Sequence, residues 1–207
     1  MRIIAGRHKG RRLLGPENQR TTRPITDRVK TAVFDALEHS GRLRGAVVLD
    51  IFSGTGSIGL ECLSRGAAHA TFVEKDRSAR ERLKRNLSTI GVGREGEIIG
   101  SDGLAAGLIP ALGRSDYTLI FMDPPYRMLF EGRHRQRLGK QMSRLAEASS
   151  PGALTAVRVE AHAEALAAGG WRWASERRVG SMRMDYYERA GDSGEAPGGE
   201  AGEAGEA

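Results

Sequence analysis

The alternation of apolar and polar positions along the chain predicts short buried strands separated by amphipathic helices. Apolar runs of strand length lie at residues 46–52, 70–75, 96–102, 117–123 and 153–160. Between them, apolar residues recur at helical intervals, as they do from Ala79 through Leu83 and Leu87 to Ile90. Three further helices are expected: one that begins at about Ser57, one that ends at about Leu112 and one over about residues 133–148. This alternation favours an α/β fold, a mostly parallel sheet with helices on both faces.

The N-terminal part of the chain follows a different pattern. Residues 1–15 predict a small basic hairpin that turns at Lys9 and Gly10. The next apolar residues share one face of a predicted helix: Ile25, Val29, Val33 and Leu37. We therefore expect an N-terminal extension, a hairpin followed by a helix, packed on the main domain.

The C-terminal part predicts an antiparallel edge of the sheet. Residues 171–179 and 182–189 read as two strands that follow a short helix. Three regions result: a basic extension of residues 1–40, a main domain of residues 41–189 and an acidic tail of residues 190–207. No internal repeat divides the chain further.

Composition narrows the class of protein. The chain has 207 residues, of which 39% are hydrophobic, enough for one domain with a full core. The last eighteen residues carry five acids and no base and have almost nothing to bury, so we expect them to be disordered. No stretch is apolar for long enough to cross a bilayer, which predicts a soluble, cytoplasmic protein. The single cysteine, Cys62, has apolar helical neighbours that favour a core residue over a nucleophile.

Basic residues are concentrated in two stretches of a chain whose net charge is +6. The first 30 residues carry nine bases and two acids, and residues 127–144 carry six bases and one acid. Each stretch alone fits a solvated surface as well as it fits phosphate contacts, but the pair favours a polyanionic partner such as nucleic acid. The candidates for RNA contact are Arg7, Lys9, Arg11, Arg12, Arg23, Arg127, Arg133 and Arg135.

A glycine-rich loop follows the first strand of the main domain. Gly54, Gly56 and Gly59 form a G-x-G-x-x-G pattern between a strand and a helix, and Glu74 ends the second strand twenty residues after Gly54. In a dinucleotide site such glycines let the backbone approach the ligand, and the acid binds ribose hydroxyls. The alternative for Glu74 is an ordinary surface acid.

Asp50 argues against a dinucleotide. It ends the first strand, beside the place where a pyrophosphate would lie, and the two negative groups would repel. S-adenosylmethionine keeps the adenosine but carries a sulfonium and an ammonium group, which an acid near the loop would attract. Asp102, which ends the third strand, is a candidate acceptor for the adenine amino group, and it fits equally well as the cap of the next helix.

The fourth strand ends in an acid, two prolines and a tyrosine, Asp123 to Tyr126. Prolines end the strand and make this lip rigid, and the carboxyl end of the strand lies where the acceptor would meet a bound methyl donor. If Asp123 and the Pro124 carbonyl accept the N–H groups of an exocyclic amine, its lone pair is localised and aimed at the methyl carbon, while Tyr126 stacks on the base. Asp123 can also take the proton. The alternative is a plain proline turn.

Five segments in this order resemble one family: MRIIAGRHKGRRL, TRPITDRVKTAVFDAL, VLDIFSGTGSIGLECLSRGA, FVEKD and LIFMDPPY. Over about residues 1–189 the chain resembles the bacterial RsmD family, the guanine-N2 methyltransferases of 16S ribosomal RNA. DPPY alone is shared with adenine-N6 DNA methyltransferases, so the N-terminal segment makes the resemblance specific. The resemblance implies a class I methyltransferase fold of seven strands, S-adenosylmethionine as cofactor and RNA within the small ribosomal subunit as substrate.

The resemblance also implies the site residues. Catalysis is expected at Asp123, Pro124, Pro125 and Tyr126. The donor is expected at Asp50, Phe52, Ser53, Gly54, Thr55, Gly56, Glu74, Lys75, Asp102 and Gly103. We expect no metal, because no cluster of His and Cys offers one, and we expect a monomer without membrane attachment.

Two segments depart from the family pattern. Residues 23–25 read RPI where RPT is usual, which moves or removes a hydroxyl near the donor. Residues 179–182 read VGSM in place of a YGDT-like segment, which affects any loop contact carried there. Three alternative functions stay open: an adenine-N6 DNA methyltransferase, a noncatalytic RNA-binding assembly factor and an NAD-dependent oxidoreductase.

Overall fold

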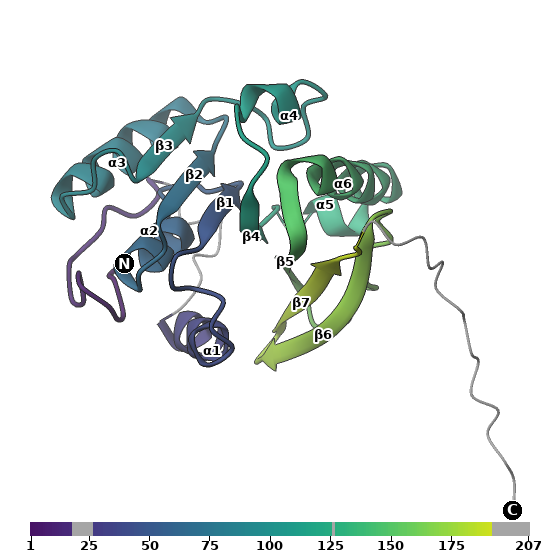
Figure 1. The fold of residues 1–207 in the computed structure, drawn as a ribbon, viewed down its shortest axis with the longest axis horizontal. Coiled ribbons are helices and arrows are strands. Elements are labelled where there is room, and N and C mark those ends of the chain that lie inside the picture. Colours follow the sequence, from purple (N-terminus) through teal and green to yellow (C-terminus); the bar gives the residue numbers. More distant parts are fainter. Residues whose placement is uncertain (18–26, 126, 192–207) are drawn as a thin grey trace, which may run out of the picture.

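One sheet with helices on both faces forms the centre of the molecule in the computed structural model, which describes residues 1–17, 27–125 and 127–191 (Figure 1). The seven strands lie in the order β3-β2-β1-β4-β5-β7-β6. They are β1 (Val47–Ile51), β2 (His69–Val73), β3 (Gly96–Ile99), β4 (Tyr117–Met122), β5 (Ser149–Glu160), β6 (Trp171–Val179) and β7 (Met182–Arg189). Strands β1 to β5 are parallel, whereas β7 is antiparallel to both β5 and β6. The predicted parallel sheet with an antiparallel edge is confirmed.

The helices form one layer on each face of the sheet. They are α1 (Asp27–His39), α2 (Ser57–Ser64), α3 (Arg77–Thr89), α4 (Leu108–Ala111), α5 (Arg127–Phe130) and α6 (Gly132–Leu145), followed by a 3-10 turn, η1 (Ala146–Ala148). Side chains of α1, α2 and α3 share one core, and those of α4, α5 and α6 share the other. In β4, Leu119 and Phe121 point to the first core, and Ile120 and Met122 to the second. Because both faces are covered, the strands read as continuous apolar runs.

Two predictions about helices need correction. The helix expected to end near Leu112 has only four residues, because the chain before it forms tight turns and Pro110 lacks the N–H that a longer helix needs. The short helix expected before residue 171 is wrong, since residues 161–170 form turns and loop. Arg183 of β7 binds the carbonyl oxygen of Ala163 at 2.6 Å, and the N–H of Leu166 donates to the Tyr187 hydroxyl at 2.8 Å. Contacts with β7 therefore replace helical hydrogen bonds there.

The N-terminal arm, residues 1–17, folds back on itself as predicted but forms no regular strands. A single antiparallel bridge joins Arg2 and Arg12, and the N–H of Gly10 donates to the carbonyl of Ile3 at 2.9 Å. The turn lies at residues 5–10 and includes the expected position. Ile3 is fully buried, so the arm contributes to the first core.

Glu61 of α2, which is fully buried, holds the arm and α1 against the main sheet. Its Oε2 accepts from the backbone N–H of Ile4 at 2.9 Å and pairs with Lys30 Nζ of α1 at 2.8 Å. Its Oε1 accepts from the N–H of Ala5 at 3.0 Å and pairs with Arg65 Nε at 3.0 Å. Three segments distant in sequence thus meet at one carboxylate.

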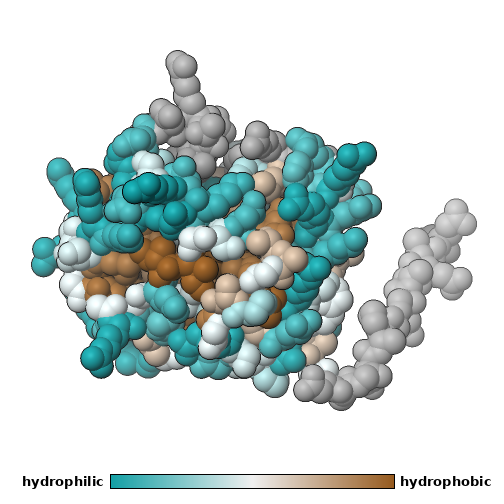
Figure 2. Space-filling model, turned by 90° about the horizontal axis from the view of Figure 1, so that it is seen from above, coloured by the Kyte–Doolittle hydropathy of each residue, from teal (hydrophilic) through white to brown (hydrophobic). Residues whose placement is uncertain are grey.

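The edge strand β3 pairs with β2 alone. Its Ile98 and Ile99 stay partly buried. Figure 2 looks onto the side where α3, β3 and α4 lie in Figure 1 and shows a band of hydrophobic surface between hydrophilic side chains. Over the described part of the chain, no helix combines the length and the apolar character that crossing a membrane would require.

Candidate active site

A pocket of about 210 Å³ lies at the carboxyl ends of the central parallel strands. Most of the residues expected at the site line it: Asp50, Phe52, Ser53, Gly54, Thr55, Glu74, Lys75, Gly103, Asp123, Pro124 and Pro125. The lining also contains residues that the sequence did not indicate: Met1, Pro16, Ser57, Ile58, Val73, Ser101, Met128 and Arg158. The structure thus brings the glycine loop and the DPP segment into one cavity, to which the arm adds two residues.

The glycine-rich loop takes a backbone shape that ordinary residues rarely adopt. Gly54 and Gly56 have φ angles of 55° and 83°, and Phe52 has a φ of 63° although it is not a glycine. A left-handed conformation costs a side chain such as Phe52 about 1–3 kcal/mol, and such strain is concentrated at functional sites. Gly59 allows close packing, because a Cβ there would lie 2.4 Å from the ring of Phe72. Gly56 packs against Leu83 and is not among the residues that line the pocket. Its contact with a cofactor therefore stays a prediction.

Asp50 is a buried acid, and one of its two carboxylate oxygens accepts no hydrogen bond from the described residues. Its Oδ2 accepts from the backbone N–H of Gly59 at 2.9 Å, and its Oδ1 has no hydrogen-bond partner among the described residues. Burial raises the pKa of Asp50 to about 8; the bond from Gly59 opposes the shift, and the charges of Asp123 and Glu74 add to it. Since Asp50 lines the pocket, its orphaned oxygen is suited to a cationic group of a ligand.

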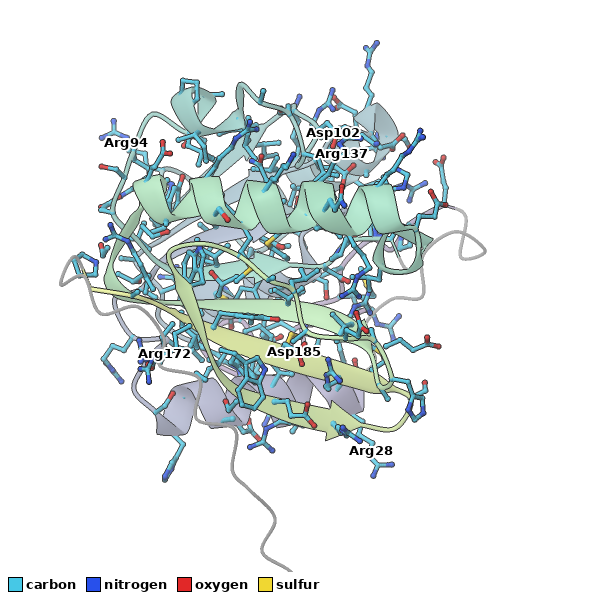
Figure 3. The ribbon with its side chains drawn as sticks, turned by 90° about the vertical axis from the view of Figure 1, so that its right-hand side faces the viewer. Arg28, Arg94, Asp102, Arg137, Arg172 and Asp185 are labelled. Carbon is cyan, nitrogen blue, oxygen red and sulfur yellow. The ribbon has the colours of Figure 1, made fainter. Side chains whose placement is uncertain are left out.

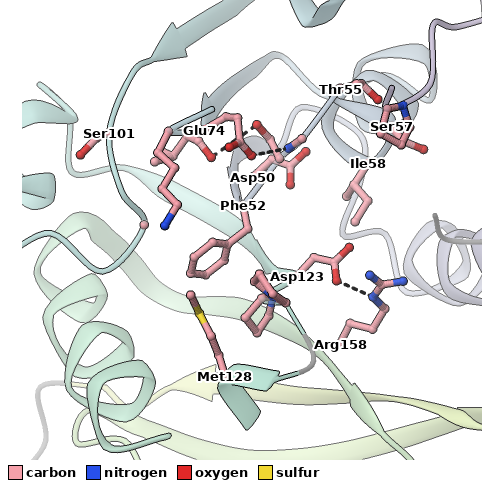
Figure 4. Close-up of a pocket in the computed structure, with 18 of the residues that line it drawn as sticks. Asp50, Phe52, Thr55, Ser57, Ile58, Glu74, Ser101, Asp123, Met128 and Arg158 are labelled. Atoms are coloured by element: carbon pink, nitrogen blue, oxygen red, sulfur yellow. Dashed lines mark hydrogen bonds and ion pairs between the residues drawn. The ribbon is translucent and has the colours of Figure 1, made fainter. Parts of the chain in front are cut away.

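Glu74 shapes the loop as well as the pocket. Its Oε2 accepts from the N–H of Gly54 at 2.9 Å (Figure 4). Its Oε1 accepts from the N–H of Asp76 at 2.8 Å. These bonds hold the glycine loop next to the end of β2 and orient the carboxylate. Glu74 is therefore not an isolated surface acid, and its oxygens keep lone pairs for ligand hydroxyls.

Asp102 lies beside the pocket and not in its lining. Its Oδ1 accepts from the N–H of Leu104 at 3.0 Å, and its Oδ2 pairs with Lys75 Nζ at 3.2 Å. Burial would raise the pKa of Asp102, but the Leu104 N–H, Lys75 and the nearby Arg137 of α6 lower it below its usual value (Figure 3). The bond to Leu104 closes a turn and not the helix α4, which begins only at Leu108. A role toward adenine stays a prediction.

Asp123 stands directly after β4 at the opposite wall from Glu74 (Figure 4). Its backbone N–H donates to the carbonyl of Ile51 at 3.3 Å, and its Oδ1 accepts from Nε of Arg158 in β5. Burial raises the pKa of Asp123, while the charge and hydrogen bond of Arg158 oppose that shift. Pro124 and Pro125 line the pocket next to it, whereas Tyr126 lies outside the described residues.

The floor between these acids is apolar. The ring of Phe52 and the side chain of Met128 face each other in the pocket, and Ile58 also lines it (Figure 4). Val73 at the end of β2 adds to this lining. An apolar lining that includes an aromatic ring and contains a few acids suits a heteroaromatic ligand, whose ring packs while its polar edges bind.

The predicted RNA-contacting bases divide into two groups. Arg7, Lys9, Arg11 and Arg12 lie exposed on the arm, and Arg7 faces Glu95 at 3.8 Å. On α6 Arg133 is exposed, but Arg135 is half-buried and binds the carbonyls of Leu129 and Glu164. Arg135 is therefore partly engaged within the protein. Arg23 lies outside the described residues, and the placement of the Arg127 side chain is not described.

Comparisons with known proteins agree with this architecture. The family model described as conserved hypothetical protein 95 matches residues 1–188. A ribosomal RNA small subunit methyltransferase D of Haemophilus influenzae is 31% identical over 191 residues, 91% of this chain and 93% of that protein. Its namesake from Escherichia coli K12 is 37% identical over 127 residues, so the alignment spans only 61% of that relative. A solved putative methyltransferase from Escherichia coli is 29% identical with a TM-score of 0.71, over 92% of this chain and 98% of that one.

The family match covers the arm, the glycine loop and the DPP segment together. The solved structure confirms the predicted class I methyltransferase fold. The family match extends from the arm to Glu188, one residue before the end of β7. The chain therefore belongs to the RsmD family.

Proposed function

We propose that this protein transfers a methyl group from S-adenosylmethionine to the exocyclic N2 amino group of a guanine in 16S ribosomal RNA of the small subunit. One observation carries the proposal: a single pocket joins a glycine loop with buried acids to an Asp123-Pro124-Pro125 lip. The names of the relatives support an rRNA methyltransferase. The choice of guanine and of its N2 atom goes beyond these names. It rests on the family resemblance and on the chemistry of the Asp123-Pro124-Pro125 lip.

The donor end of the pocket fits S-adenosylmethionine. When bound, this donor supplies a methyl group on a cationic sulfur, and the carbon–sulfur bond breaks with its electron pair left on sulfur. We assign Asp50 to the positive charge of the donor, because this residue lines the pocket, its buried Oδ1 has no hydrogen-bond partner among the described residues, and a cation there would favour its ionised form. We assign Glu74 to the ribose hydroxyls, and Asp102 with Gly103 to the adenine edge.

The acceptor end orients an amino group. An exocyclic amine on a base is a weak nucleophile, because its lone pair is delocalised into the ring. Asp123 and the Pro124 carbonyl accept its two N–H bonds, which localises the lone pair and directs it into the pocket. The nitrogen then forms its bond to the methyl carbon, and its surplus proton passes to Asp123 or to water. Orientation of this kind contributes several kcal/mol of the rate enhancement, on the order of 7–11 at most.

The exposed bases of the arm supply the contact with RNA. They lie on the segment whose Met1 and Pro16 reach the pocket, so RNA bound along the arm would arrive beside the site. Phosphate contacts of this type position the substrate without reading its sequence. The target base would have to leave its helix to enter the pocket.

The test is methyl transfer from a labelled donor to small ribosomal subunits that lack the modification. Naked 16S RNA and duplex DNA run beside them, and nucleosides are identified by mass spectrometry. N2-methylguanosine in the RNA is expected. Methyladenine in DNA would instead identify a DNA methyltransferase, and a rise in melting temperature with NAD in place of S-adenosylmethionine would indicate an oxidoreductase.

A matched pair of variants separates catalysis from RNA binding. Asp123→Asn removes the acceptor charge, whereas Asp116→Asn changes an exposed acid at the other end of β4. We expect Asp123→Asn to lose methyl transfer by 100-fold or more, on the order of a general base's contribution, with RNA affinity kept. Asp116→Asn should behave as wild type. Undiminished function in Asp123→Asn would favour a noncatalytic assembly factor.

A further inference from the structure

Arg158 of β5 reaches the candidate site although no sequence motif contains it. In the parallel register Met122 of β4 lies opposite Val157 of β5, so Asp123 and Arg158, one residue further along each strand, stand side by side. Nε of Arg158 donates to Oδ1 of Asp123, and both residues line the pocket (Figure 4). Arg158 is 8% exposed, so water screens this ion pair little.

The surroundings of Asp123 explain why it needs a cation. Burial raises the pKa of this carboxyl, and the next acid, Asp50 of β1, is buried as well. Across the pocket stand Glu74 and Lys75, which follow β2. The helices contribute uncharged side chains to this lining, Ser57 and Ile58 from α2 and Met128 from α5. Among the described residues, Arg158 is the cation that forms an ion pair with Asp123.

We propose that Arg158 is a positioning residue for methyl transfer: it holds Asp123 ionised and fixes the direction of its carboxylate. The proposal rests on the function proposed above. Arg158 binds Oδ1 and so fixes the plane of the carboxylate, and we assign Oδ2 as the oxygen that accepts the N–H of the base. In the transfer, the amine nitrogen bonds to the methyl carbon, the carbon–sulfur electron pair stays on sulfur, and the surplus nitrogen proton passes to Asp123 or to water. A protonated Asp123 would lose one acceptor oxygen and its capacity as a base.

The type of residue matters in this arrangement. The guanidinium of Arg158 is planar and rigid, so it fixes the angle of the carboxylate as well as its charge. Lysine would keep the charge but lose the direction, and glutamine would lose both. The proposal therefore orders the activities as wild type, then Arg158→Lys, then Arg158→Gln.

The first measurement is the pH profile of kcat/KM for methyl transfer to RNA. In Arg158→Gln the acidic limb should move upward by about one pH unit or more, which means at least a tenfold loss of ionised Asp123 below that limb. Arg158→Lys should keep the limb near its wild-type position with a lower kcat. The control is Arg114→Gln, which removes a half-buried arginine that is also paired with an acid but lies before the opposite end of β4, and it should leave the profile unchanged. A wild-type acidic limb in Arg158→Gln would overturn the proposal.

The second measurement needs no activity. Carboxyl-13C NMR follows the titration of Asp123 in the protein alone, with its signal assigned by its loss in Asp123→Asn. We expect a higher midpoint in Arg158→Gln than in wild type, and equal midpoints would refute the role of Arg158. The titration tests the two proposals separately. A protein that methylates no RNA would refute the proposed function, whereas the midpoint of Asp123 would still show whether Arg158 keeps this carboxyl ionised. If Arg158→Gln does not fold, a wild-type kcat in Arg158→Lys would overturn the proposal equally.

Discussion

Replacing Glu61 by glutamine tests whether one buried carboxylate anchors the N-terminal arm and α1. Glutamine has nearly the same size, so the change removes charge and not volume. In the wild-type protein the carboxylate binds two backbone N–H groups of the arm and pairs with Lys30 and Arg65. Glu61 is fully buried and Lys30 is 1% exposed, so solvent cannot replace the lost charge.

The loss of stability expected for Glu61→Gln depends on which partners Lys30 and Arg65 keep. Arg65 retains two exposed acids of α1, Asp35 at 3.1 Å and Glu38 at 2.7 Å. Lys30 retains the carbonyl oxygen of Arg2 at 3.2 Å but loses its ion pair with Glu61. Removal of one partner of a buried pair costs about 3–5 kcal/mol, because an uncompensated charge stays in the interior. We expect Glu61→Gln to lose about that much, most of it at Lys30.

Urea unfolding followed by circular dichroism measures this loss, and limited proteolysis reports release of the arm. Glu38→Gln is the control: its side chain is 58% exposed, and the change should cost about 1 kcal/mol or less. Adding Lys30→Met to Glu61→Gln should recover a large part of the stability, since no buried cation is then left unpaired. A Glu61→Gln protein no less stable than the Glu38→Gln control would refute the assignment of Glu61 as anchor.

Three further predictions concern packing, titration and RNA contact. Gly59→Ala should cost about 1–3 kcal/mol in urea unfolding, because its Cβ would meet the buried Phe72 ring at 2.4 Å, whereas Gly93→Ala, with no atom within 4 Å, should be near neutral. Asp50 has a pKa of about 8 when folded against 3.8 ordinarily, so folding binds a proton and stability falls as pH rises between these values. Asp50→Asn cannot take up this proton. Its stability relative to wild type should therefore rise with pH over that range, by no more than about 1.4 kcal/mol per pH unit, and level off above it. A stability difference that does not change with pH would contradict the raised pKa of Asp50. Neutralising Arg7, Lys9, Arg11 and Arg12 of the arm should flatten the salt dependence of RNA affinity in fluorescence anisotropy, and an unchanged slope would remove these bases from the interface.

The sequence predicts most of the sheet because local patterns determine it. Apolar runs of strand length, bounded by Gly, Asp and Pro, locate all five parallel strands, although some ends differ by up to four residues: β3 ends at Ile99 and not at residue 102, and β5 begins at Ser149 and not at residue 153. The location of the site follows from the same reasoning, since carboxyl ends of neighbouring parallel strands meet at one edge. Asp50, Glu74 and Asp123 end three such strands and do line one pocket.

The features that the sequence did not predict depend on contacts between distant segments. Arg158 reads as an ordinary strand residue, and only the register of β4 on β5 places it beside Asp123. Glu61 is an acid within an apolar helix, and its partners lie in the arm and α1. The loop at residues 161–170 has helix-forming residues, but the side chains of β7 satisfy its backbone instead. Knowledge of the strand register would have found Arg158; no local pattern could have found the other two.

The position of β7 has a consequence for how the chain is made. This strand lies between β5 and β6, yet it is synthesised after both of them. While the ribosome is still translating, β5 has an open hydrogen-bonding edge and β6 has no neighbour in the sheet. Such edges attract other strands, so the nascent chain passes through a stage prone to aggregation. Arg183 and Tyr187, which fasten the loop that follows β5, arrive with that final strand, as does Met184, which lies opposite Arg158 of β5. The wall of the pocket that holds Arg158 therefore reaches its final form only when translation has passed residue 189.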